Sequence, residues 1–318
     1  MWNGYNRHMQ KFRINQSFVS TILLISFLLI SACEPVQQPT TSEPTQEQEQ
    51  PTVVIHTVTP EATLAPTQIP AALRVNGVLV SLSYFQNEVL RYKDSLINQA
   101  VQATDQEIQE KVIEYLVEQE LLAQAARAAE FALSDEQLQA RIDQLVAELG
   151  SGGALTTWMQ ANHYDDAEFR ASLRLAAEAA WQRDQIIQSV PNEVEQVRAQ
   201  QIFASTEAGA QRALNSLNAG AEFEKLAWEY SPESGGELGW FPRGYLLYPE
   251  VEEAAFSLEP GSYSEIIQST IGYHILLVLE HEQSHPLTTD ARVSLQAKAL
   301  QDWLAQARSN AEIEVLLP

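Results

Sequence analysis

A glycine-rich segment between residues 235 and 244 constrains the fold of this chain more than any other feature. It reads Gly-Gly-Glu-Leu-Gly-Trp-Phe-Pro-Arg-Gly. Glycine adopts positive φ and lets a second backbone approach closely, so this spacing around Leu, Trp and Phe predicts a sharply bent backbone beside an apolar surface. Further along the chain, Gly272-Tyr273-His274-Ile275 leads into an apolar run that is typical of a buried strand.

The residues around these two motifs predict a mixed domain of strands and helices. Apolar residues recur with helical spacing after Pro249, and that pattern stops at Glu259-Pro260-Gly261. The elements expected here, in chain order, are a strand at 197–204, helices at 207–219 and 221–230, a helix at 249–257, and strands at 263–268 and 274–278.

Together these residues strongly resemble the parvulin family of peptidyl-prolyl isomerases. The family pattern GGDLGWF, RG, AAF, PG and GYHI is matched from Val197 to about Glu280. The resemblance implies an antiparallel sheet flanked by helices at about 195–282. It also implies cis–trans isomerisation of X–Pro bonds, with no cofactor and no metal.

The resemblance also maps an apolar socket for the proline ring. The residues expected to bind substrate are Leu238, Leu247, Val251 and Phe256. Relatives often carry Met in place of Leu247 and Phe in place of Val251, which predicts a shallower socket in this chain. An insertion near Tyr245 leaves the register of Leu247 open. Alternatively, the socket residues are ordinary core residues.

Three polar positions are the expected catalytic surround: His274, Gln201 and Glu233. His274 matches the last-strand histidine of the family, whereas Gln201 stands where relatives carry a second histidine, and Glu233 matches loosely. Glutamine can bridge a hydrogen bond to His274 but carries no charge. Two functions therefore stay open, an active isomerase and a binding-only chaperone with a weak or inactive parvulin domain.

The N-terminus carries the pattern of an export signal. Three basic residues precede an apolar stretch at 18–30, which is short for a membrane span and typical of a signal peptide. Ile30-Ser31-Ala32-Cys33 resembles a bacterial lipobox, which implies cleavage after residue 32 and a lipid on Cys33. An ordinary signal peptide is the alternative. Cys33 is the only cysteine, so an intrachain disulfide and thiol catalysis are excluded.

Residues 33–72 are rich in Pro, Thr, Gln and Glu, and this composition predicts a disordered tether. Because three of the 19 basic residues and none of the 42 acidic residues precede Cys33, the processed chain has a net charge of −26. Such an acidic chain argues against nucleic-acid binding, which needs a basic surface.

The sequence pattern of residues 73–190 predicts a mostly helical module. It opens on Asn76-Gly77 between alternating apolar residues, a strong hairpin signal. Ser134 and Gln137 form a capping box, with Leu133 and Leu138 as a hydrophobic staple. Helices are expected at 84–99, 104–129, 134–149, 155–162, 165–189 and 289–310, followed by an extended tail at 313–317.

A helical module is thus followed by a parvulin domain and then by a returning helix at 287–318, which we expect to pack on that module. This order resembles the SurA/PrsA group of extracytoplasmic foldases. The resemblance implies an α+β chain anchored to the bacterial membrane by its lipid. Its implied partners are unfolded exported polypeptides with X–Pro bonds. A structural lipoprotein of the cell envelope is a further alternative.

His281 and His285 have helical metal-ligand spacing, but Pro286 favours a loop, and no metal site is expected.

Overall fold

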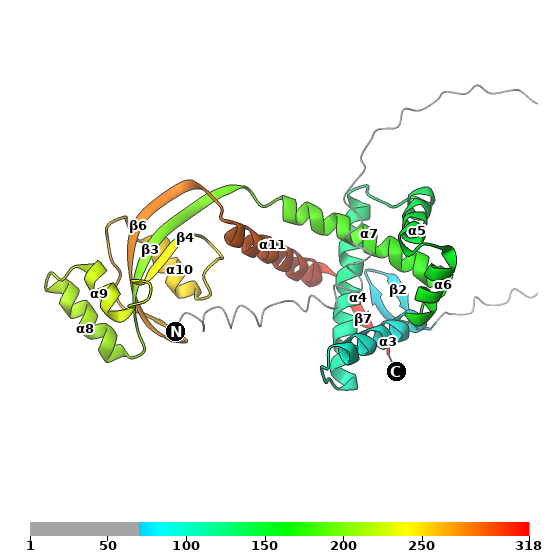
Figure 1. The fold of residues 1–318 in the computed structure, drawn as a ribbon, viewed down its shortest axis with the longest axis horizontal. Coiled ribbons are helices and arrows are strands. Elements are labelled where there is room, and N and C mark those ends of the chain that lie inside the picture. The colour runs from blue at the N-terminus through cyan, green and yellow to red at the C-terminus, as the bar shows by residue number, and fades with distance from the viewer. Residues whose placement is uncertain (1–69, 318) are drawn as a thin grey trace, which may run out of the picture. The chain divides into compact units, whose positions relative to one another are not determined.

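The computed structural model describes residues 70–317 (Figure 1). The strands are β1 (Ala71–Val75), β2 (Val78–Ser81), β3 (Glu193–Ala204), β4 (Glu237–Pro242), β5 (Ile267–Ser269), β6 (Gly272–Pro286) and β7 (Ile313–Val315). The helices are α3 (Leu82–Asn98), α4 (Asp105–Ala128), α5 (Asp135–Leu149), α6 (Gly152–Ala161), α7 (Asp166–Gln188), α8 (Glu207–Asn218), α9 (Phe223–Tyr230), α10 (Pro249–Ser257) and α11 (Thr289–Asn310).

These residues divide into two compact units. The larger unit holds Val117–Leu138 and Arg174–Ala311, and the smaller unit holds residues 70–116, 139–173 and 312–317. The chain therefore passes between the units several times, and α4 and α7 each contribute residues to both.

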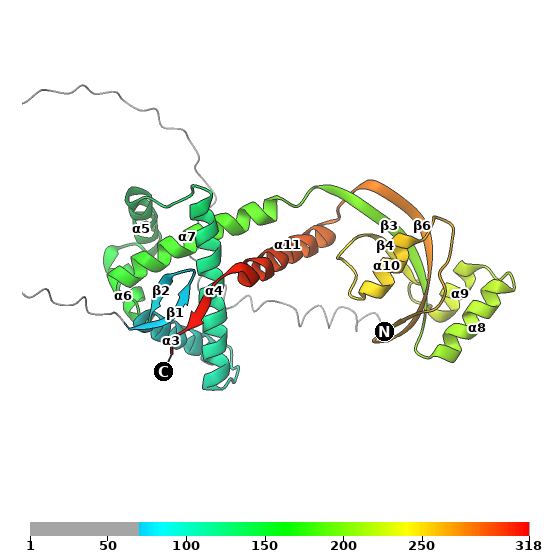
Figure 2. The same cartoon turned by 180° about the vertical axis from the view of Figure 1, so that it is seen from behind.

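The centre of the larger unit is an antiparallel sheet with the strand order β4-β3-β6-β5. Helices α8 and α9 lie on one side of the sheet and α10 on the other (Figures 1 and 2). Successive strand residues point to opposite faces, so Ile202 and Ile275 pack with α8 and α9, whereas Val197 and Leu276 pack with α10. Two separate apolar cores result, one on each face.

A third apolar core in the larger unit joins three helices. Leu122 of α4 and Ile186 of α7 are buried against Trp303 and Leu304 of α11. Arg127 of α4 reinforces the α4–α7 contact through an ion pair of 2.6 Å with the buried carboxylate of Glu178.

The smaller unit contains a three-stranded sheet with the order β2-β1-β7. Asn76 and Gly77 form the turn between β1 and β2, with φ of 50° and 84°. Positive φ at both positions is the geometry of the type I′ hairpin turn that favours Asn-Gly. The Asn76 side-chain oxygen also accepts a hydrogen bond of 2.9 Å from the backbone N–H of Glu312, just before β7.

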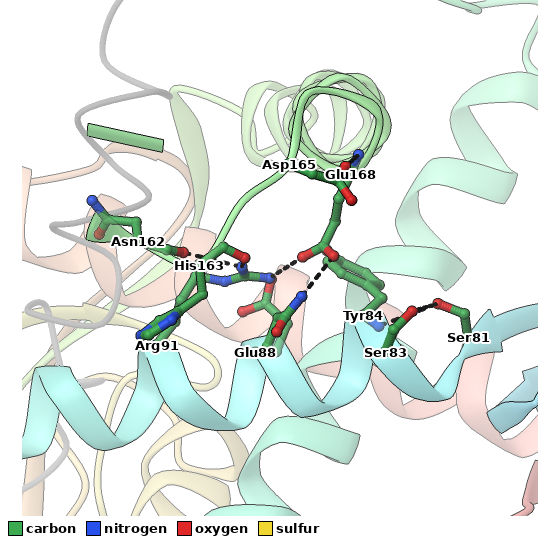
Figure 3. Close-up of polar contacts among 10 residues, drawn as sticks. Ser81, Ser83, Tyr84, Glu88, Arg91, Asn162, His163, Asp165 and Glu168 are labelled. Atoms are coloured by element: carbon green, nitrogen blue, oxygen red, sulfur yellow. Dashed lines mark hydrogen bonds and ion pairs between the residues drawn. The ribbon is translucent and has the colours of Figure 1, made fainter. Parts of the chain in front are cut away.

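A largely buried arginine, Arg91, ties α3 to the segment between α6 and α7 (Figure 3). Arg91 Nη2 lies 2.8 Å from Glu88 and 3.1 Å from Glu168, and Nη1 donates to the backbone oxygens of Asn162 and His163 at 3.2 and 3.1 Å. The guanidinium also lies 3.8 Å from the centre of the Tyr164 ring. A cation, two carboxylates and an aromatic face thus share one enclosed site.

The predicted α+β class is confirmed, as are the Asn76-Gly77 hairpin, the capping box and the helix at 289–310. The loop expected at His281 and His285 is wrong. Strand β6 continues to Pro286 because its second half pairs with the first half of β3. The His285 ring stacks on Trp240 at 3.9 Å. Strand β5 is also shorter than expected, beginning at Ile267.

The signal peptide, Cys33 and nearly all of the tether lie outside the described residues. Within residues 70–317, no helix is long and apolar enough to cross a membrane. The same residues contain no group of three His, Cys, Asp or Glu side chains placed to hold a metal ion.

Gly236 explains part of the glycine motif. It lies beside β3, where its carbonyl oxygen accepts a hydrogen bond of 2.8 Å from the Gln201 N–H. Its φ is +70°, and an added Cβ would overlap the Gln201 carbonyl oxygen. Gly239 has the same φ of +70°, but a Cβ there would meet nothing within 4 Å. The two glycines therefore share a left-handed conformation and differ in their contacts.

We expect Gly236→Ala to lower the free energy of unfolding by about 3 kcal/mol or more, because strain and backbone overlap add. Gly239→Ala should cost about 1 kcal/mol, from the left-handed conformation alone. Urea denaturation followed by tryptophan fluorescence measures both. Equal costs would contradict the close contact between Gly236 and β3.

We expect Arg91→Ala to lower the free energy of unfolding by about 3–5 kcal/mol, because Glu88 and Glu168 would stay enclosed without their cation. Lys111→Ala, which removes an exposed ion pair with Glu114 on α4, should cost less than about 0.5 kcal/mol. Far-UV circular dichroism in urea compares the two variants. An Arg91→Ala cost as small as the Lys111→Ala cost would show that the cluster adds little to stability.

Candidate functional site

His274 is the centre of the candidate site. It lies on β6 opposite Phe203 of β3 and Ile267 of β5, and its side chain is almost fully buried. Its Nδ1 atom lies 2.8 Å from Gln201 Oε1, and its Nε2 atom lies 2.8 Å from Ser269 Oγ. The fold thus joins three strands through one chain of side-chain hydrogen bonds.

The partners of His274 determine its tautomer. An amide oxygen only accepts hydrogen bonds, so Nδ1 carries the proton and donates to Gln201. In the neutral ring, Nε2 is then the acceptor for the Ser269 hydroxyl. Burial lowers the pKa of His274 below its ordinary value of 6.5, and the charge of Glu250 opposes this shift. The imidazole is therefore neutral at neutral pH.

Two aromatic rings lie beside the imidazole. The Phe203 ring centre is 5.1 Å from that of His274, and the Tyr248 ring centre is 6.0 Å away. Tyr248 ends the segment that connects β4 to α10, so this segment reaches the site. The side chains around His274 thus combine a neutral polar chain with an apolar wall.

The residues predicted to form the apolar socket differ in how far they are exposed to solvent. Leu247 is 62% exposed on the segment before α10, and Leu238 is partly buried beside the α10 core. Val251 is buried within that core. Leu247 is thus the predicted residue that offers apolar surface to solvent, with Tyr248 next to it.

Phe256 lies elsewhere in the same core. Its ring centre is 5.9 Å from that of His281, seven residues along β6 from His274, which is about 20 Å of strand. The Arg243 guanidinium lies 4.1 Å from the centre of the Phe256 ring. The structure therefore places Phe256 in the α10 core beside His281, and its role in substrate binding stays a prediction.

The hydrogen-bond partners of His274 are Gln201 and Ser269, and the catalytic role expected of Glu233 stays a prediction. Glu233 is exposed in the turn before β4, while both ring nitrogens of His274 are engaged by Gln201 and Ser269. Sequence reasoning missed Ser269 because its contact depends on the β5–β6 hairpin. A hydroxyl residue just before the turn at Gly272 was the available signal. The predicted hydrogen bond between Gln201 and His274 is present.

Two family models match this chain. Residues 186–280 match the PPIC-type PPIASE domain, and residues 52–173 match the SurA-like N-terminal domain. These ranges overlap most of the parvulin-like region and most of the helical module expected from the sequence.

Curated relatives include foldases and a chaperone. "Foldase protein PrsA" of Halalkalibacterium halodurans is 38% identical over 128 residues, which are 36% of this chain and 38% of that one. "Chaperone SurA" of Bordetella avium is 32% identical over 148 residues, 39% of this chain and 29% of that one. The chain spans about two fifths of the length of the first curated relatives that it matches.

Among solved structures, PrsA of Bacillus cereus is 21% identical, with a TM-score of 0.40, covering 66% of this chain and 83% of that one. The parvulin NmPin of Nitrosopumilus maritimus is 33% identical, with a TM-score of 0.25, covering 29% of this chain and all of that one. By its matching family models, this chain combines a SurA-like N-terminal domain with a PPIC-type, or parvulin, peptidyl-prolyl isomerase domain.

Proposed function

We propose that this protein is an extracytoplasmic foldase that isomerises X–Pro bonds in exported polypeptides. The observation that carries the proposal is the Gln201–His274–Ser269 chain within a PPIC-type domain. Its buried imidazole lies beside the segment that exposes Leu247. The relatives named foldase and chaperone support the same conclusion.

The reaction requires little beyond an apolar surface for the proline ring and a polar surround for the amide; we call this proposed pair the groove. Rotation about an X–Pro bond meets a barrier of roughly 18–20 kcal/mol in water, and no covalent bond forms or breaks. A catalyst must hold the proline ring and stabilise the twisted amide more than the planar one. We propose that Leu238, Leu247 and Val251 form the apolar side of the groove. The neutral His274 chain forms its polar side without bringing a charge against the apolar substrate.

We propose that the substrates are unfolded or partly folded polypeptides carried across the membrane. The SurA-like domain would hold them while the parvulin domain acts. The Cys33 lipid would keep the protein at the membrane, and the acidic chain suits peptide rather than nucleic-acid partners.

A second candidate is a binding-only chaperone. Gln201 in place of a second histidine favours it, because a glutamine cannot exchange a proton with His274. Suppression of client aggregation at near-stoichiometric ratio, without isomerase activity, would identify this function. A structural envelope lipoprotein would show neither activity.

We expect the protein to accelerate isomerisation of X–Pro tetrapeptides, and His274→Ala to lower kcat/KM at least about tenfold, or about 1.4 kcal/mol. His285→Ala, on the same strand but outside the site, should keep the parent activity. If the parent is inactive and Gln201→His gains activity, the groove is intact and the chain is a chaperone. Inactivity of both would argue against an isomerase groove.

The pH profile of the parent tests the protonation state of His274. Because burial lowers its pKa, kcat/KM should stay constant above pH 6.5 and fall only below it, as a protonated Nε2 stops accepting from Ser269. A profile that rises toward acid pH would contradict the neutral imidazole.

The anchor makes a separate prediction. We expect a bacterial host to attach lipid to Cys33, so that the protein stays with membranes after high-salt washing and incorporates a labelled fatty acid. Cys33→Ser should lose the label and move to the soluble fraction. Unlabelled but processed parent protein would instead indicate an ordinary signal peptide.

A further inference from the structure

The segment between β4 and α10, residues 243–248, is held by one carboxylate. Glu252 Oε1 accepts a hydrogen bond of 2.7 Å from the N–H of Gly244. Glu252 Oε2 accepts bonds of 3.0 Å each from Tyr245 and Leu246. Three successive backbone donors therefore converge on a single side chain from the first turn of α10. Gly244 adopts φ of +81° at the start of this arrangement.

Contacts on both sides of this triplet limit the segment further. At its start, Arg243 lies over Phe256 and within 3.6 Å of Glu195. At its end, the Tyr248 ring lies beside His274. Leu247 falls between these anchors and stays 62% exposed. These contacts fix the residues on both sides of Leu247, so the position of the Leu247 side chain depends on them.

An anionic acceptor suits this task for two reasons. Hydrogen bonds to a carboxylate are stronger than those to a neutral acceptor. A negative charge in the first turn of α10 also interacts favourably with the helix dipole. A neutral glutamine of the same size offers one oxygen and one NH₂ group, and the NH₂ group would face a backbone donor.

We infer that Glu252 is the positioning residue of the isomerase groove, holding residues 244–246 so that Leu247 is preset for the proline ring. The inference rests on the proposed function for its substrate. Its structural part, the ordering of this segment by Glu252, stands independently of catalysis. Glu252 touches no substrate in this account and acts through the backbone.

The test compares full-length parent, Glu252→Gln and Glu259→Gln, a matched change at an exposed glutamate just past α10. In Glu252→Gln, hydrogen–deuterium exchange should be at least tenfold faster in peptides covering 243–248. The KM for an X–Pro tetrapeptide should rise about five- to tenfold, with kcat within twofold, because a looser groove weakens substrate and transition-state binding alike. Glu259→Gln should match the parent in every measurement.

With an active parent, three outcomes overturn the inference. The first is unchanged exchange at 243–248 in Glu252→Gln. The second is faster exchange with unchanged KM. The third is a lower kcat at constant KM, which indicates loss of folded enzyme rather than a displaced groove. If the parent has no isomerase activity, the proposed function fails by itself, and the Kd of the same tetrapeptide replaces KM. A five- to tenfold weaker Kd then supports the role of Glu252, and an unchanged Kd overturns it.

Discussion

The pairing of β3 with β6 is the interaction on which the candidate site depends. Its register sets Gln201 opposite Leu276 and Phe203 opposite His274. Because side chains alternate along a strand, this register sends Gln201 and His274 to the face that also carries α10. A slip of one residue would turn Gln201 toward α8 and α9 and place Ile202 beside the imidazole. The hydrogen-bonded chain therefore follows from strand register before any property of the individual side chains.

Both units use a buried or half-buried charge to fix a connecting segment. In the smaller unit the charge is a cation: Arg91 donates hydrogen bonds to the backbone oxygens of Asn162 and His163 between α6 and α7. In the larger unit the charge is an anion: Glu252 accepts hydrogen bonds from the backbone N–H groups of residues 244–246. A connecting segment has backbone groups without ladder partners, and one polyvalent side chain satisfies several of them.

Much of the fold could be predicted because local chemistry determined it. Asn76-Gly77 permits the positive φ of a tight turn, and the glycine at 236 leaves room for a neighbouring backbone. The sequence could not show where β6 ends, because its polar second half, including His281 and His285, is stabilised by β3 rather than by apolar burial. Ser269 was missed for the same reason, because its distance from His274 depends on the pairing of β5 with β6, which no single segment encodes.

The hydrogen-bonded sheet of the smaller unit joins the two ends of the described chain. Strand β7 pairs with β1, and Arg74 meets Glu314 across 240 residues of sequence. During synthesis β1 emerges long before β7 is made. The backbone groups along one edge of β1 therefore have no strand partner until residue 315 has been synthesised. The entire intervening chain, including the parvulin domain, is then a loop that β7 closes. Completion of this sheet is accordingly a late and long-range folding event, which requires synthesis to have passed residue 315.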